Sequence, residues 1–91
     1  MRERDIERYL VAETENLLGE QRKVQWVNRR HAPDRLVWLP KWRFPKLAEL
    51  KKPGKPLEPG QKREHARLKK MGFECFKIDS YEDVDRLLST R

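Results

Sequence analysis

Apolar residues recur at helical spacing near the start of the chain. Ile6, Leu10, Leu17 and Leu18 follow one another at helical intervals and form a single stripe along a helix. Gly19 comes directly after this stripe, where a glycine commonly ends a helix. The pattern therefore predicts a helix over residues 2–18.

Four further segments have the short apolar runs of strands. The first alternates Val24 and Trp26 with polar neighbours, although Val27 interrupts the alternation. The second is apolar enough to be covered on both faces, and a turn follows it. The third begins after Pro45, which has no backbone donor and belongs at the start of a strand. The expected strands are residues 23–28, 35–39, 46–51 and 73–78.

The second half of the chain contains a loop and two expected helices. Residues 52–60 are rich in Pro and Gly and predict a loop. Residues 61–71 predict a basic helix that Gly72 ends. Ser80 is an expected N-cap of a short final helix, with Asp83 as its capping partner. The order is helix, three strands, helix, strand, helix, which indicates one α/β domain over residues 1–91.

Composition adds two constraints to this pattern. A domain of 91 residues has a thin core, so a partner subunit would help to stabilise it. Charged residues make up 41% of the chain and the mean hydropathy is −1.05, values that also occur in disordered chains. Three Trp, two Tyr and three Phe, together with the periodic apolar runs, favour a folded domain.

The net charge indicates the kind of partner. A formal charge of +7 attracts polyanions, of which nucleic acid is the commonest, although it can also serve solubility alone. The single cysteine, Cys75, excludes an intrachain disulfide and suits a reducing cytoplasm. No apolar run reaches the length of a membrane span, and the charged N-terminus does not resemble a signal peptide. We therefore expect a cytoplasmic protein without a membrane partner.

Two acidic residues and a lysine are placed to converge. Glu49 and Lys51 are two residues apart on a strand and project from the same face. If the second and third strands form a hairpin, Asp34 lies roughly opposite Glu49. Two close carboxylates repel each other, and a divalent cation such as Mg²⁺ or Mn²⁺ relieves that repulsion. The set suits metal-assisted phosphodiester hydrolysis, but Glu-x-Lys and Pro-Asp pairs also occur by chance.

Longer stretches of the chain resemble a known nuclease family. They are residues 3–10 of the opening helix, Pro33-Asp34-Arg35, residues 49–56, Gln61, Met71-Gly72-Phe73 and Ile78-Asp79-Ser80. With these segments the chain resembles the virus-type replication-repair nuclease (VRR-NUC) domain, a branch of the PD-(D/E)XK superfamily. The resemblance implies a restriction-endonuclease-like αβββαβ(α) core, with a mixed sheet flanked by helices. Ala32 and Pro45 depart from the family pattern and leave the shape of two loops open.

The resemblance also implies roles for individual residues. Asp34 and Glu49 would hold Mg²⁺ or Mn²⁺, Lys51 would be the catalytic lysine, and Gln61 would contact substrate beside them. The opening helix would add a further acid, for which Glu3 is favoured over Glu7. Stand-alone members resemble Holliday-junction resolvases, which implies a homodimer acting on branched DNA.

Several residues outside this set have alternative interpretations. Basic residues flank the expected site and are candidate phosphate contacts: Arg29, Arg30, His31, Lys52 and Lys55. The basic face of the second helix is equally consistent with DNA contact and with simple solvation. Trp26, Trp38 and Cys75 are expected in the core and His65 on a helix surface. Trp42 is left open between base stacking and a dimer contact.

Two other classes of function compete with the nuclease. A basic second helix after three strands also suits a non-catalytic double-stranded RNA-binding-like module. This interpretation does not explain the convergence of Asp34, Glu49 and Lys51. A small accessory protein that binds another protein is the third class. That class predicts no requirement for metal and no salt-sensitive affinity for nucleic acid.

Overall fold

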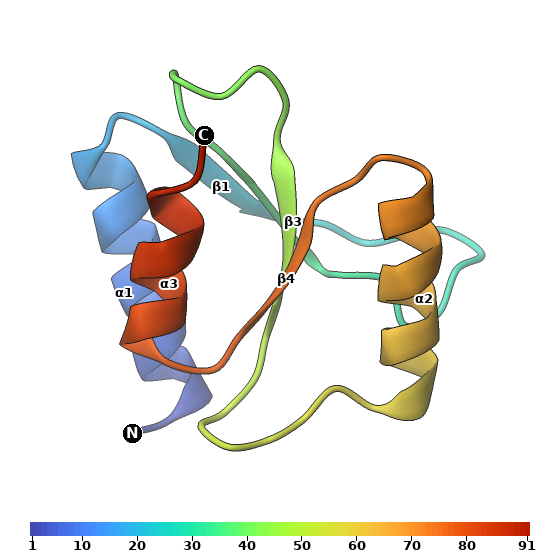
Figure 1. Cartoon of the computed structure of the whole chain (residues 1–91). Helices are drawn as coiled ribbons and strands as arrows, with labels where there is room; N and C mark the ends of the chain where they lie inside the picture. Colours follow the sequence, from blue (N-terminus) through green and yellow to red (C-terminus); the bar gives the residue numbers. More distant parts are fainter.

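The computed structural model describes residues 1–91 as a four-stranded sheet with three helices packed on it (Figure 1). Strand order across the sheet is β1-β2-β3-β4. In chain order the elements are α1 (Glu3–Asn16), β1 (Glu20–Lys23), β2 (Arg35–Trp38), β3 (Lys46–Leu50), α2 (Pro59–Lys70), β4 (Cys75–Ile78) and α3 (Tyr81–Leu88). This is the predicted α/β order, and none of the helices is both long and apolar enough to cross a membrane.

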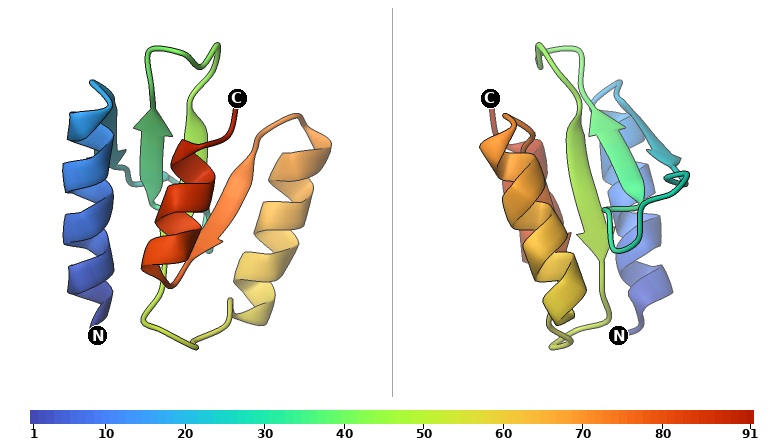
Figure 2. Two further views of the ribbon diagram at one scale, coloured as in Figure 1. Left: turned by 60° about the vertical axis from the view of Figure 1, so that its left-hand side comes forward. Right: turned by 90° about the vertical axis from the view of Figure 1, so that its right-hand side faces the viewer.

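The sheet is mixed, as expected. β1, β2 and β3 are successive antiparallel neighbours, whereas β4 runs parallel to β3. Parallel neighbours need a crossover connection, and α2 provides it between β3 and β4. The helices form two layers: α1 and α3 lie side by side on one face of the sheet, and α2 covers the other (Figures 1 and 2).

Each face of the sheet has its own apolar cluster. On the α1–α3 face, Ile6, Leu10, Val84 and Leu87 pack against the strands and are fully buried. On the α2 face a smaller cluster joins Leu47, Leu68 and Cys75. Strand alternation separates the two sets, since Leu47 and Ala48 are neighbours on β3 and belong to different clusters. Residues 49 and 51 therefore project on the α2 side.

The end of α1 differs from the prediction. The helix stops at Asn16, and Leu17 and Leu18 are exposed rather than part of the apolar stripe. Leu18, not Gly19, adopts the left-handed conformation, with φ of 61°. Gly19 is required for close packing, because a Cβ there would lie 2.5 Å from the carbonyl oxygen of Trp38. The glycine thus lets the chain pass from α1 into the sheet.

The first strand was predicted too late in the sequence. β1 comprises Glu20–Lys23, a polar edge strand that pairs with β2, and residues 24–28 leave the sheet. The apolar alternation there has another cause: Trp26 packs against the α2-side cluster and its indole N–H donates to the carbonyl of Pro33 at 2.8 Å. Asn28 then turns the chain with a positive φ of 61°. Trp26 is a core residue, as expected, but it lies in a loop.

Two other side chains are more buried than predicted. Trp42 belongs to the core and its indole N–H donates to the carbonyl of Thr90 at 2.8 Å, so it is placed neither to stack on a base nor to meet a second chain. His65 is only 4% exposed and faces the sheet, so it is not a helix surface residue. Trp38 packs against the core and Cys75 is buried, as expected.

The ends of the last two helices follow local capping rules. α2 begins at Pro59, inside the expected loop, because proline is well suited to the first turn of a helix. α3 begins after Ser80, whose Oγ accepts from the backbone N–H of Asp83 at 3.0 Å. The carboxylate of Asp83 in turn accepts from the N–H of Asp79 at 3.1 Å. The predicted N-cap and its partner are both confirmed.

Candidate active site

Asp34 and Glu49 are brought together by the register of the β2–β3 hairpin. Arg35 pairs with Ala48 and Leu36 with Leu47, so one further step along both strands sets Asp34 opposite Glu49. The connection spans residues 39–45, longer than a tight two-residue turn. Glu49 is also adjacent to β4, where it pairs with Lys77. The predicted convergence of the two carboxyl groups is therefore what the sheet produces.

The electrostatic surroundings of Glu49 tie four groups into one site. Burial is the largest cause raising the pKa of Glu49, and the negative charge of Asp34 adds to it. Lys51 lowers this pKa, whereas Glu3 raises it further, and the outcome is a pKa of about 7. A carboxyl group with such a value is half protonated near neutral pH. The site thus holds more negative charge than its own lysine neutralises.

Lys51 is held firmly by its backbone while its ammonium group remains uncommitted. Its N–H donates to the carbonyl of Ile78 at 2.8 Å, which fixes the residue just beyond the end of β3. The side chain is only 7% exposed. Yet Lys51 takes part in none of the ion pairs of the molecule. A mostly buried cation without a partner is available to a phosphate or to a reacting oxygen.

The two acids of α1 have different surroundings. Glu7 forms an ion pair with the buried guanidinium of Arg35, which also donates to the side chain of Gln21 at 2.8 Å. Glu3 makes no ion pair but lies near enough to Glu49 to raise its pKa. The start of α1 lies at the same end of the molecule as the loop that follows β3 (Figures 1 and 2). Glu7 thus ties α1 to the sheet, and Glu3 is free to face the site.

Gln61 also has a structural role at the start of α2. It is the third residue of α2, and its side-chain oxygen accepts from the backbone N–H of Glu58 at 2.9 Å. Glu58 and Gln61 form a capping box, and the Glu-x-x-Gln spacing could have revealed it. The amide NH₂ of Gln61 is left over for other contacts.

Comparison with known proteins decides the family. No family model matches the sequence. However, "Putative nuclease p44" of Acyrthosiphon pisum secondary endosymbiont phage 1 is 40% identical over 88 residues, which are 97% of this chain and 92% of that protein. A solved structure described as "VRR_NUC domain" superimposes with a TM-score of 0.81 at 34% identity, covering 94% of this chain and 92% of the other. The chain belongs to the VRR-NUC family.

The acids of this VRR-NUC domain do not form a closed metal cage. No three His, Cys, Asp or Glu side chains lie close enough together to hold a metal ion by themselves. Asp34 and Glu49 are neighbours, while Glu3 acts on Glu49 across space. Two carboxylates nevertheless suit Mg²⁺ or Mn²⁺, because these ions usually keep several waters or substrate oxygens in their remaining coordination positions. Burial is the first cause of the raised pKa of Glu49 and the charges of Asp34 and Glu3 add to it, and a bound cation would favour the ionised form.

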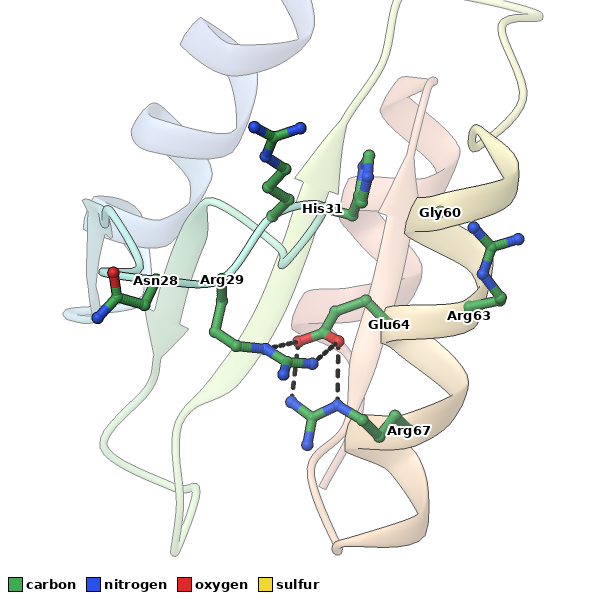
Figure 3. A pocket seen from close by; sticks show the side chains of 8 residues that line it. Asn28, Arg29, His31, Gly60, Arg63, Glu64 and Arg67 are labelled. Carbon is green, nitrogen blue, oxygen red and sulfur yellow. Dashed lines mark hydrogen bonds and ion pairs between the residues drawn. The ribbon is translucent and has the colours of Figure 1, made fainter.

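The basic residues of the VRR-NUC domain fall into two groups. Lys52 and Lys55 are exposed on the loop between β3 and α2. Arg29, Arg30 and His31 line a hollow of about 380 Å³ between their loop and α2 (Figure 3). The α2 side of that hollow contributes residues that the sequence analysis did not assign to a site, namely Gly60, Arg63, Glu64 and Arg67.

Proposed function

We propose that this VRR-NUC domain is a Mg²⁺- or Mn²⁺-dependent endonuclease that hydrolyses phosphodiester bonds in DNA. The observation that carries the proposal is the convergence of Asp34, Glu49 and the unpaired Lys51 at one end of the sheet. The nuclease relative and the VRR-NUC neighbour support the same activity.

The acidic residues supply the place for the cation. Asp34 and Glu49 would hold it, and Glu3 would complete the set from α1. When bound, the cation would stabilise negative charge on the phosphate and help to activate a nucleophilic water. The carboxylates contribute by being fixed in advance, since the hairpin register places Asp34 and Glu49 before any ligand arrives.

Lys51 would act on the phosphate through its charge and its hydrogen-bond donors. The negative charge on the phosphoryl oxygens grows as the attacking oxygen approaches, and an ammonium group close to them would stabilise that charge. Burial strengthens this effect, because little water lies between the lysine and its target. Gln61 would contact the substrate through the amide NH₂ that its capping role leaves free.

The choice of substrate is the finer part of the proposal. We propose branched DNA, such as a four-way junction, cut by a homodimer whose two sites act on two strands. Only 21 of the 91 residues are buried, which agrees with a domain that gains from a second subunit. Because the relative comes from a phage, we further propose that the domain acts in the cytoplasm of a bacterial host.

The test is cleavage of a labelled four-way junction and of a matched linear duplex, each with Mn²⁺, Mg²⁺ or EDTA. We expect metal-dependent cutting by the wild-type protein, at least about a hundredfold less by Lys51→Ala, and a preference for the junction. Lys41→Ala is the matched control, since Lys41 lies in the β2–β3 connection at the far end of the hairpin.

Three other outcomes separate the competing functions. Cutting without preference for the junction would support the nuclease activity and contradict the proposal that branched DNA is the substrate. Salt-sensitive binding without cutting in any metal would instead favour a non-catalytic nucleic-acid-binding module. Neither binding nor cutting would favour an accessory protein that acts through protein contacts.

A further inference from the structure

A large hollow on the surface is lined mainly by charged residues. It lies between residues 28–31 and α2, and no hydrophobic residue lines it. Four guanidinium groups and one carboxylate surround it, those of Arg29, Arg30, Arg63, Arg67 and Glu64 (Figure 3). A concave surface with this excess of positive charge concentrates anions.

Glu64 holds two of the arginines in fixed positions. Its side chain is only 6% exposed, and both of its oxygens are engaged. Arg67 donates through Nε and Nη2 at 3.0 and 2.9 Å, and Arg29 donates from the opposite loop. The hydrogen bonds from Arg67, and then those from Arg29, lower the pKa of Glu64 to about 2. The carboxylate of Glu64 and the two guanidinium groups, together called the clamp, therefore stay charged at any physiological pH.

Glu64 leaves some donors of Arg29 and Arg67 unused, although Nη1 of Arg67 also donates to the Sδ of Met71 at 3.8 Å. A guanidinium group has five N–H donors, and each of the two arginines turns only Nε and Nη2 toward Glu64. Arg30 and Arg63 make no ion pair at all. A tetrahedral anion with several acceptor oxygens matches this set of paired and unpaired guanidinium groups.

The hollow is connected to the candidate active site on both of its walls. Residues 28–31 lead directly to Asp34, and Gly60 precedes Gln61 on α2. His31 packs against Gly60 so closely that a Cβ at that position would lie 2.7 Å from the imidazole ring. His65, next to Glu64, lies near enough to Lys51 for its pKa to be affected. An anion in the hollow would therefore flank the phosphate being cut.

We propose that this hollow binds a backbone phosphate of the DNA next to the scissile one, and that Glu64 is a positioning residue that holds Arg29 and Arg67 for it. This rests on the proposed function for the identity of the polymer. It assigns DNA contacts to Arg63 and Arg67, on the face of α2 that the sequence left open between DNA contact and solvation.

The first test measures binding without cleavage. Fluorescence anisotropy with labelled duplex and four-way junction in EDTA compares Arg63→Ala with Lys41→Ala, two variants of equal charge. We expect Arg63→Ala to bind roughly fivefold more weakly and to lower the slope of log affinity against log salt by about one, whereas Lys41→Ala stays close to wild type. Equal behaviour of the two variants would overturn the proposal.

Glu64→Gln separates positioning from total charge. The substitution makes the protein more positive, so general attraction alone predicts tighter binding. Loss of the clamp predicts weaker binding, by roughly fivefold, because Arg29 and Arg67 lose their common anchor. Tighter binding would overturn the positioning role. Should Glu64→Gln fail to fold, Arg67→Lys keeps the charge but not the paired donors, and weaker binding is again expected.

A neutral methylphosphonate moved along the DNA then locates the contact. One position near the cut should weaken binding of the wild-type protein and have no effect on Arg63→Ala. Absence of any such position would overturn the site. These binding results do not depend on cleavage. If the wild-type protein cuts DNA but Arg63→Ala binds as tightly as wild type, only the proposed phosphate site in the hollow is wrong. If the wild-type protein never cuts DNA, only the proposed nuclease activity is wrong.

Discussion

Glu49 shows how a single side chain can report on a site of this kind. Its pKa is raised from 4.5 to about 7, chiefly by burial and by the charge of Asp34. Between these two values the folded protein binds more protons than the unfolded chain. Stability must therefore fall as the pH rises through this window, because the native state is forced to ionise a group that its surroundings disfavour.

Glu49→Gln should remove this dependence. In EDTA, the free energy of unfolding of the variant relative to wild type should rise by on the order of 1 kcal/mol between about pH 5 and pH 8, after allowance for partial exposure of the group. Urea unfolding at several pH values measures it. Added Mg²⁺ or Mn²⁺ should stabilise the wild type and not the variant. A difference independent of pH would mean that Glu49 has an ordinary pKa.

The site residues that depend on strand geometry could be predicted from the sequence. Alternation put Glu49 and Lys51 on one face, and a simple hairpin put Asp34 opposite Glu49. The buried state of His65 and the pairing of Glu64 with Arg29 were not accessible in this way. The first depends on how α2 packs on the sheet and the second on a loop that folds back to α2, and no local pattern of the sequence encodes either contact.

Among the elements, helix ends were predictable where a side chain caps them. Ser80 was recognised as an N-cap, and the structure shows its bond to Asp83. We expect Ser80→Ala to lower the free energy of unfolding by about 1 kcal/mol. Ser89→Ala, which affects only a hydroxyl at the exposed end of α3, is the matched control in urea unfolding. Equal losses in the two variants would show that the cap contributes no more than the end of the helix.

The start of α2 offers a sharper experiment, because Gln61 has a cap role and a proposed substrate role. Gln61→Glu keeps an acceptor for the N–H of Glu58, whereas Gln61→Ala removes it. We expect the glutamate variant to retain its melting temperature and lose cleavage, since it lacks the amide donors. The alanine variant should lose cleavage and about 1 kcal/mol of stability. Full activity in Gln61→Glu would confine the residue to capping.

β1 shows why one element was misplaced. Apolar alternation is a good sign of a strand only when the alternating residues lie in the sheet. Val24 and Trp26 instead lie in a loop, where Trp26 packs against the α2-side cluster, while the true strand is a polar edge with one row of its backbone unpaired. Edge strands need few apolar residues, so the tertiary position of β1 decided the outcome rather than its composition.

The whole molecule leaves three large apolar side chains in solvent at one place. Phe44, Met71 and Phe73 are 70%, 56% and 46% exposed, and together they line a hollow of about 300 Å³. The loops that carry them adjoin the starts of β3 and β4, at the opposite end of the hairpin from Asp34 and Glu49. Exposed apolar clusters commonly mark protein interfaces. A second copy meeting this surface would leave both active sites open to DNA.

This arrangement predicts the oligomeric state and the surface that sets it. Sedimentation at micromolar concentration should give twice the 11.1 kDa of one chain. Phe44→Ser combined with Phe73→Ser should give a folded monomer, while Val27→Ser, which changes an even more exposed apolar residue elsewhere, should remain a dimer. The monomer should still cut one strand at a time, because the proposed site takes all of its residues from one chain, but it should lose paired cuts in a junction. A wild-type monomer that makes paired cuts would show that two independent encounters suffice and that the second subunit is not needed.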